Sequence, residues 1–281
     1  MSATSPPAVR KGYVPTSRGE IHYRTVGAGA RHVVFLACVS TGGLGFHDVL
    51  PLMAARGYRA VAIDIMGYGR SDRMSGEWLM GDFADNLAEA MRALDVRPTR
   101  LVAGHFSALV AIELAARGTA GIERLVLDGA YIASAEARAR QATRAPATAW
   151  HEDGRHMREA WTKAYAILKR VDPGLTLDAH PNAALREHAL DLMAHFAFDQ
   201  DVSLASSRFD TAQRISAIVA PTLVVSSEAD WNYPHLGPIA ALVPGARTHV
   251  FPGVHPLHQL GRADRAGEYV EVIEDFFAPS G

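Results

Sequence analysis

The chain has 281 residues, 48% of them hydrophobic and 21% charged, which is the composition of an ordinary soluble globular protein with a sizeable core. A formal net charge of −2 gives no electrostatic basis for binding nucleic acid or an anionic membrane surface. The single cysteine excludes an internal disulfide framework, and no apolar run approaches the roughly 20 residues that span a bilayer. We therefore expect a cytoplasmic protein without a signal peptide.

The first 130 residues are predicted to alternate between strands and helices. Two short strand patterns, 12–16 and 20–25, flank a turn at Ser17-Arg18-Gly19 and suggest a hairpin. Apolar strand patterns then follow at 32–39, 58–63, 100–104 and 123–127. Helical spacing separates them at 46–56, 77–94 and 108–117. Continuously apolar strands linked by helices indicate an α/β fold with a mostly parallel sheet covered on both faces.

Between residues 131 and 210 the alternation stops. This stretch contains no convincing strand, only helical patterns at 135–144, 156–170 and 183–198. The sheet pattern resumes at 221–225, and a last strand at 247–251 and a helix at 262–277 complete the chain. We expect residues 131–210 to form a helical lid on a core made of 1–130 and 211–281. Such a lid would cover the carboxyl ends of the strands, where ligands of parallel sheets bind.

The most informative motif is Val102-Ala103-Gly104-His105-Phe106-Ser107-Ala108, where a strand turns abruptly into a helix. In a strand–nucleophile–helix elbow the apex residue is strained, and the residues two before and two after it must be small. Gly104 and Ala108 satisfy that requirement and place Phe106 at the apex. Phenylalanine cannot attack a substrate, so the pattern predicts an elbow without its nucleophile.

Three further motifs in the expected order resemble the α/β-hydrolase superfamily over residues 12–278. Asp64-Ile65-Met66-Gly67-Tyr68-Gly69-Arg70-Ser71-Asp72 resembles that family's loop after its fourth strand. The strand at 221–225, running on to Asp230, resembles the strand that ends at the catalytic acid, and Pro252-Gly253-Val254-His255 resembles the loop of the catalytic histidine. The chain departs from the family at Phe106 and at Leu36-Ala37-Cys38-Val39, where a His-Gly pair is usual.

The resemblance implies a role for each of several residues. His255 would take or relay a proton, with Asp230 orienting its ring. The two backbone donors of the oxyanion hole would fall at Val39 and Ser107. Glu228 and Asp128 are less favoured substitutes for the acid, and His258 is a minority alternative for the histidine.

Other residues are expected to contact a substrate. Phe106, Cys38, Trp231 and Trp161 are candidate pocket-lining residues, although each is also compatible with a packing role. A register shifted by one residue would make Ser107 the nucleophile, but His105 and Leu109 would then occupy the crowded flanking positions. We expect no metal site and no cofactor.

The preferred function is therefore proton-transfer chemistry, without a covalent intermediate, on a small and largely apolar molecule. Elimination, isomerisation, cyclisation and cofactor-free oxygenation have this form, and superfamily members lacking covalent chemistry are associated with polyketide or aromatic metabolites. One rival is a serine esterase that uses Ser107, His255 and Asp230. The other is a ligand-binding or receptor-like protein without turnover. The expected partner is a small-molecule substrate, with neither nucleic acid nor membrane, and a homodimer is left open.

Overall fold

The structure is a computed structural model that describes residues 8–36, 42–118, 120–142, 150–171, 183–198, 202–259 and 262–278. Val39 and Cys38, which were expected near the oxyanion loop, lie outside these described residues.

Eight strands form one sheet in the order β1-β2-β4-β3-β5-β6-β7-β8. Their bounds are β1 Arg10–Thr16, β2 Gly19–Val26, β3 Arg31–Leu36, β4 Tyr58–Ile63, β5 Thr99–Gly104, β6 Ile122–Asp128, β7 Thr222–Ser227 and β8 Arg247–Phe251. β1 and β2 form the antiparallel hairpin that the sequence predicted, β2 also runs antiparallel to β4, and the remaining pairs are parallel. The predicted mostly parallel sheet is therefore confirmed.

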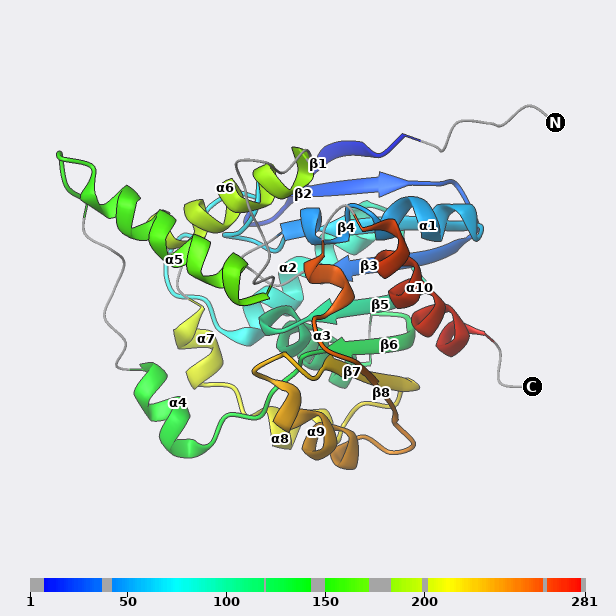
Figure 1. The fold of residues 1–281 in the computed structure, drawn as a ribbon. Coiled ribbons are helices and arrows are strands. Elements are labelled where there is room, and N and C mark those ends of the chain that lie inside the picture. Colours follow the sequence, from blue (N-terminus) through cyan, green and yellow to red (C-terminus); the bar gives the residue numbers. More distant parts are fainter. Residues whose placement is uncertain are drawn as a thin grey trace.

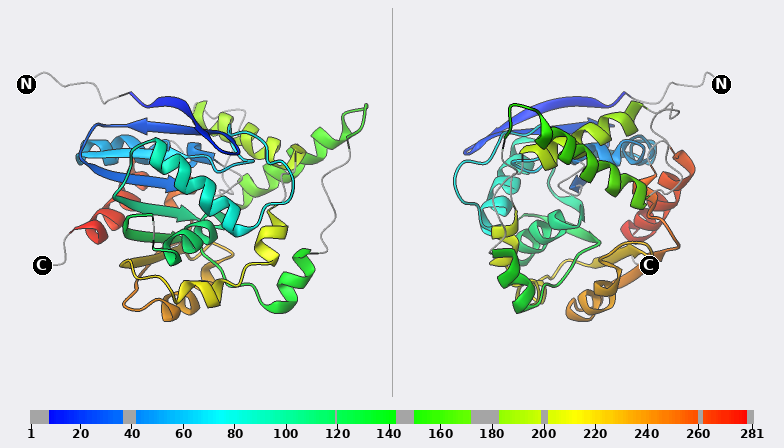
Figure 2. Two further views of the ribbon diagram at one scale, coloured as in Figure 1. Left: turned by 180° about the vertical axis from the view of Figure 1, so that it is seen from behind. Right: turned by 60° about the vertical axis from the view of Figure 1, so that its left-hand side comes forward.

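Helices cover both faces of this sheet (Figures 1 and 2). One face packs against α1 (Val49–Ala55) and α10 (Ala263–Phe277), with Phe35, Met53 and Tyr269 in the core between them. The opposite face packs against α2 (Met80–Ala93), α3 (Phe106–Ala116), α8 (Thr211–Ile215) and α9 (Leu236–Leu242). Short 3-10 turns lie at η1 Gly42–Phe46, η2 Tyr233–His235 and η3 Pro256–His258. Every residue of α3 from Phe106 to Ala115 is buried, because this helix lies between the sheet and α2.

Of the five described helices between β6 and β7, all but α8 lie beyond the carboxyl ends of the parallel strands (Figure 1). They are α4 (Ala135–Ala142), α5 (Arg155–Val171), α6 (Ala183–Phe198) and α7 (Ser203–Ser207). The periodicity of the sequence located α4, α5 and α6 but not the short α7 and α8. α5 and α6 pack on each other through Ala164, Leu168, Leu185, Ala189 and Leu192, a small apolar cluster separate from the two cores of the sheet.

One carboxylate attaches α6 to the strands below it. Oε1 of Glu187 lies 3.3 Å from Nη2 of Arg24, 2.5 Å from Nη2 of Arg70 and 3.8 Å from Nζ of Lys11. The side chain of Arg24 is only 5% exposed, so its charge depends on this partner. The position of α6 over the sheet is thus set by ion pairs as well as by packing. Among the described helices, none is both long and apolar enough to cross a membrane.

Candidate active site

The apex of the elbow is His105. β5 pairs with β6 as far as Gly104, α3 begins at Phe106, and His105 between them has φ +53° and ψ −120°. The predicted apex at Phe106 is therefore wrong by one residue. Its position follows from pairing with β6: Gly104 is opposite Asp128, and the N–H of His105 donates to the carbonyl oxygen of Asp128 at 2.8 Å.

The residues that flank this apex are also small. Ala103 and Ser107 lie two before and two after His105, so the requirement for small flanking side chains is met in the observed register as well. A left-handed conformation is costly for a residue with a β-carbon and is retained where the surrounding structure enforces it. The fold therefore presents an imidazole at the position where the family carries a nucleophile.

His105 is held by Asp230, which follows β7. Nε2 of His105 lies 3.1 Å from Oδ2 of Asp230, and the Asp230 carboxylate is nearly inaccessible to solvent. Burial opposes ionisation of this carboxyl group, but contact with His105 and a hydrogen bond from the N–H of Asn232 to Oδ1 outweigh it and lower the pKa of Asp230 to about 2. Asp230 is therefore a carboxylate at any physiological pH and favours a proton on Nε2 of His105.

The other ring nitrogen of His105 faces Asn232. Nδ2 of Asn232 donates to the carbonyl oxygen of Gly129 at 2.8 Å and lies 3.5 Å from Nδ1 of His105, the outer limit of a hydrogen bond. With the proton on Nε2, Nδ1 carries the lone pair of the imidazole. Trp231 packs edge-on against the ring, with centroids 5.8 Å apart.

The predicted pairing of His255 with Asp230 is wrong, because His255 contacts Asp128 instead. Nε2 of His255 lies 3.2 Å from Oδ1 of Asp128, and the N–H of Leu257 donates to Nδ1 of His255 at 3.2 Å. Oδ2 of Asp128 accepts a hydrogen bond from the hydroxyl of Tyr269 at 3.0 Å. Burial, and then the Asp128 carboxylate, raises the pKa of Tyr269 well above its usual value, so the hydroxyl stays protonated. Nδ1 of His255 thus accepts a hydrogen bond, whereas its Nε2 faces the Asp128 carboxylate without forming one.

His258 lies between the two histidine–aspartate pairs. Its ring centroid is 5.3 Å from that of His255 and 6.5 Å from that of His105. Enclosure within the protein, and then the neighbouring imidazoles, lowers the pKa of His258 to about 3. Burial likewise lowers the pKa of His188 on α6 to about 4. Both rings are neutral at physiological pH. No three His, Cys, Asp or Glu side chains of the described residues are arranged to hold a metal ion.

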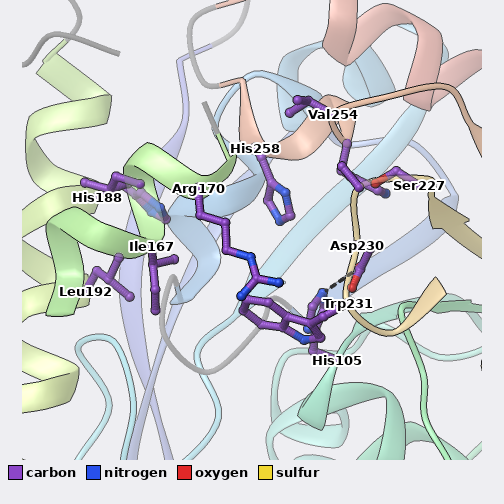
Figure 3. Close-up of a pocket in the computed structure, with 13 residues that line it drawn as sticks. His105, Ile167, Arg170, His188, Leu192, Ser227, Asp230, Trp231, Val254 and His258 are labelled. Atoms are coloured by element: carbon purple, nitrogen blue, oxygen red, sulfur yellow. Dashed lines mark ion pairs between the residues drawn. The ribbon is translucent and has the colours of Figure 1, made fainter. Parts of the chain in front are cut away.

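These residues surround a cavity between the sheet and the pair α5–α6, with a volume of about 770 Å³ that includes space open to solvent. The sheet side contributes His105, Ser227, Asp230, Trp231 and His258. The helix side contributes Ile167, Leu168, Arg170, His188 and Leu192, and Figure 3 shows the Arg170 side chain reaching across to Trp231. The surface of the cavity is mostly apolar, with a few polar groups converging on His105.

The remaining predicted site residues have different positions. Trp231 lines the cavity as expected. Phe106 points into the core, where it packs edge-on against Phe83 with ring centroids 5.4 Å apart. Trp161 stacks on Tyr165 on the outside of α5 and is absent from the described cavity lining. Ser107 is fully buried in the first turn of α3, so it is not at the apex and is not exposed to a substrate.

With His105 at the apex, one predicted backbone donor shifts by one residue. The N–H that follows the apex belongs to Phe106 rather than to Ser107, and it is the first of the helix N–H groups that have no intrahelical acceptor. The other predicted donor, Val39, is among the residues that the structure does not describe. Of the two backbone positions predicted as oxyanion donors, the described part of the site thus contains only the one that follows the apex.

Sequence reasoning missed the position of His105 at the apex and gave Asp128 only a minor part. The signals were present, since shifting the elbow by one residue also leaves small residues at both flanks, and Asp128 ends a strand next to β7. Asn232 and Arg170 gave no sequence signal, because their roles depend on how loops and helices far apart in the chain meet.

The arrangement of strand, elbow, acid loop and histidine loop defines the class of protein. The chain belongs to the alpha/beta hydrolase family, whose model matches residues 33–272. The motifs that suggested this family therefore identified it correctly.

Several relatives are hydrolases by name. The chain is 25% identical over 227 residues to a candidate carbamate hydrolase, RutD, of Variovorax paradoxus, which covers 75% of this chain and 78% of that protein. Its fold resembles an enol-lactonase of Burkholderia xenovorans, with a TM-score of 0.74, 19% identity and coverage of 95% and 99% of the two chains. A hydrolase of Pseudomonas aeruginosa is similar at a TM-score of 0.73, 23% identity and coverage of 95% and 98%.

Proposed function

We propose that this chain is an enzyme in which His105, oriented by Asp230, acts as a general base on a small, largely apolar substrate. The observation that carries the proposal is the imidazole at the elbow apex with Nε2 3.1 Å from the Asp230 carboxylate. A histidine fixed by a carboxylate has a defined tautomer and a stabilised imidazolium form, which are the properties of a proton acceptor.

The proton would move to Nδ1 of His105. The substrate carbon or oxygen that loses it retains the electron pair, and the resulting imidazolium is stabilised by Asp230 through Nε2–H. An oxyanion or enolate that develops on the substrate would be stabilised by the N–H of Phe106 at the start of α3. The apolar residues from α5 and α6 would exclude water from the developing charge.

Direct proton abstraction is the first candidate reaction because the apex carries no hydroxyl, thiol or carboxylate that could form a covalent intermediate. It includes elimination, isomerisation and cyclisation, in which the protonated His105 returns its proton to another substrate atom. The proton is taken from and returned to the substrate, so no cofactor is required.

Hydrolysis by an activated water is the second candidate, and the names of the relatives favour it. Here His105 would take a proton from water as the oxygen adds to an ester, lactone or carbamate carbonyl. The same proton would then pass to the leaving group when the tetrahedral intermediate collapses. This route also avoids an acyl-enzyme, so both candidates depend on His105 and differ in whether water enters the product.

Two measurements test the proposed base. The first is hydrogen–deuterium exchange next to the carbonyl of phenylacetone in D₂O, followed by NMR. The second is hydrolysis of phenyl acetate in isotope-labelled water, with mass spectrometry of the acid product and of the protein. We expect His105→Gln and Asp230→Asn to reduce the affected rate at least 100-fold, in the range of general-base contributions. His47→Gln, a change of an exposed histidine away from the cavity, is the control.

A fluorophosphonate probe separates this proposal from the serine-esterase alternative. We expect no labelling of the native protein, and we expect Ser107→Ala to leave turnover unchanged. Labelling of Ser107 would overturn the proposal. If neither rate depends on His105, the binding-protein alternative is favoured instead.

A further inference from the structure

We propose that Arg170 binds the anionic group of the substrate, so that the substrate is a small apolar molecule carrying a carboxylate. This inference rests on the proposed function for the identity of the site, and it adds the charge class of the substrate.

The charge balance of the cavity supports this inference. Among the described residues that line it, Arg170 and Asp230 are the two with a formal charge, and the Asp230 carboxylate is turned to His105. His188 and His258 are neutral because enclosure lowers the pKa of each to about 4 and about 3. The described part of the cavity therefore offers a ligand one positive charge that forms no ion pair with a described lining carboxylate.

Arg170 also has no ionic partner among the described residues. Other arginines at this end of the sheet are paired: Arg24 and Arg70 both contact Glu187. The guanidinium of Arg170 instead lies over the ring of Trp231, with Cζ 5.3 Å from the ring centroid. A guanidinium held over an indole ring keeps N–H groups available for a ligand, and a guanidinium can bind a carboxylate in a bidentate manner.

Further polar groups of the same cavity lack partners. Nδ1 of His188 and Oγ of Ser227 are buried and have no hydrogen-bond partner in the described structure. A buried polar group without a partner is unfavourable, and a bound molecule can supply the missing hydrogen bond. The apolar side chains of Ile167 and Leu192 lie on the same side of the cavity as His188 (Figure 3) and suit the hydrocarbon part of the same molecule.

The positions of Arg170, His105 and the apolar residues of α5 and α6 indicate where each part of the ligand would bind. Figure 3 shows Arg170 between His188 and the His105–Asp230 contact. A carboxylate on Arg170 would hold the rest of the molecule with one end near His105 and an apolar face against α5 and α6. Because Arg170 belongs to α5, recognition of the anion couples this helix to the sheet.

The test is a calorimetric titration of the full chain with matched acids and amides. The pairs are phenylacetate with phenylacetamide, cinnamate with cinnamamide, and hydrocinnamate with hydrocinnamamide, which differ in charge and little in shape. We expect at least one acid to bind at least tenfold more tightly than its amide. Arg170→Gln should abolish that preference and Arg170→Lys should retain part of it.

Two variants serve as controls. Lys163→Gln removes a positive charge from the same helix about 10 Å away along its axis and should leave the preference intact. His105→Gln should still bind the acid, because binding does not require the base. If the native protein shows turnover that depends on His105 but binds acids no more tightly than amides, this inference alone is overturned. If the native protein prefers acids but shows no turnover that depends on His105, only the proposed function is overturned.

Charge reversal gives an independent readout. Arg170→Glu should reject the acids and bind phenethylamine more tightly than the native protein does. Equal binding of acids and amides by the native protein, absence of saturable acid binding across the series, or an acid preference that survives in Arg170→Gln would each overturn the inference.

Discussion

Gly129 leaves the space that the imidazole of His105 occupies. A β-carbon on Gly129 would lie 3.0 Å from both Cδ2 and Nε2 of His105, and 2.9 Å from Oδ2 of Asp230. Gly129 also has φ +58°, which disfavours side chains. The contact between His105 and Asp230 therefore depends on residue 129, directly after β6, having no β-carbon.

We expect Gly129→Ala to separate His105 from Asp230 and to reduce turnover at least tenfold. The matched control is Gly245→Ala, since Gly245 has φ +69° and a β-carbon there would meet nothing within 4 Å. Both variants should lose about 1–2 kcal/mol of stability from backbone strain, but only Gly129→Ala should lose activity. Equal activity of the two variants would contradict the proposed role of this contact.

His255 is expected to stabilise the fold rather than to exchange protons with the substrate. His255→Asn removes the contact with Asp128 and the hydrogen bond from Leu257, and should cost about 1–3 kcal/mol in urea unfolding. The shape of the pH–rate profile should stay that of the native enzyme, because His105 remains. If His255→Asn keeps its stability but its pH–rate profile no longer shows the ionisation of the general base, His255 and not His105 is the base.

The stability of the protein should fall in mild acid because of His258. Its folded-state pKa of about 3 lies below the ordinary value of 6.5, so the unfolded chain binds its proton first. The free energy of unfolding is therefore not reduced by His258 above pH 6.5, and it decreases as the pH falls from 6.5 toward 3. We expect His258→Asn to reduce the change in unfolding free energy between pH 7 and pH 4 by on the order of 2 kcal/mol.

His47→Asn is the control for that experiment, because His47 is exposed. Its pH dependence in urea unfolding should match that of the native protein. If His258→Asn and His47→Asn have the same pH dependence, His258 is not responsible for the acid sensitivity.

Glu187 is expected to hold α6 against the strands. Glu187→Gln leaves the nearly buried Arg24 without its carboxylate and should cost about 1–2 kcal/mol, less than a fully buried pair because Glu187 is partly exposed. Hydrogen exchange should increase across α6 while β5 and β6 stay protected. Glu159→Gln on α5, an exposed position, should change neither.

Most of the fold could be predicted because its signals are local. Buried strands are continuously apolar, and their bounds at β4 and β8 agree with the pattern to the residue. α7 and α8 were not predicted because helices of five residues give less than two full turns of periodicity.

The site was harder to predict because its geometry is non-local. The small-residue rule fits the elbow in two registers, and only the pairing of Gly104 with Asp128 selects His105 over Phe106. The order of acid and histidine along the chain was correct for the family. Which aspartate meets which histidine depends on the paths of the loops after β6 and β7, and the sequence contains no local record of those paths.

Asp128 ends β6, Asp230 lies in the loop after the neighbouring β7, and each contacts an imidazole of its own. Residue 105 can therefore change without disturbing the pair formed by His255 and Asp128. In an evolving or engineered enzyme, a single substitution at position 105 would replace the imidazole at the apex by a hydroxyl. The pair formed by His255 and Asp128 would be present before and after that substitution. The scaffold thus keeps a carboxylate-paired histidine next to the apex whichever residue occupies position 105.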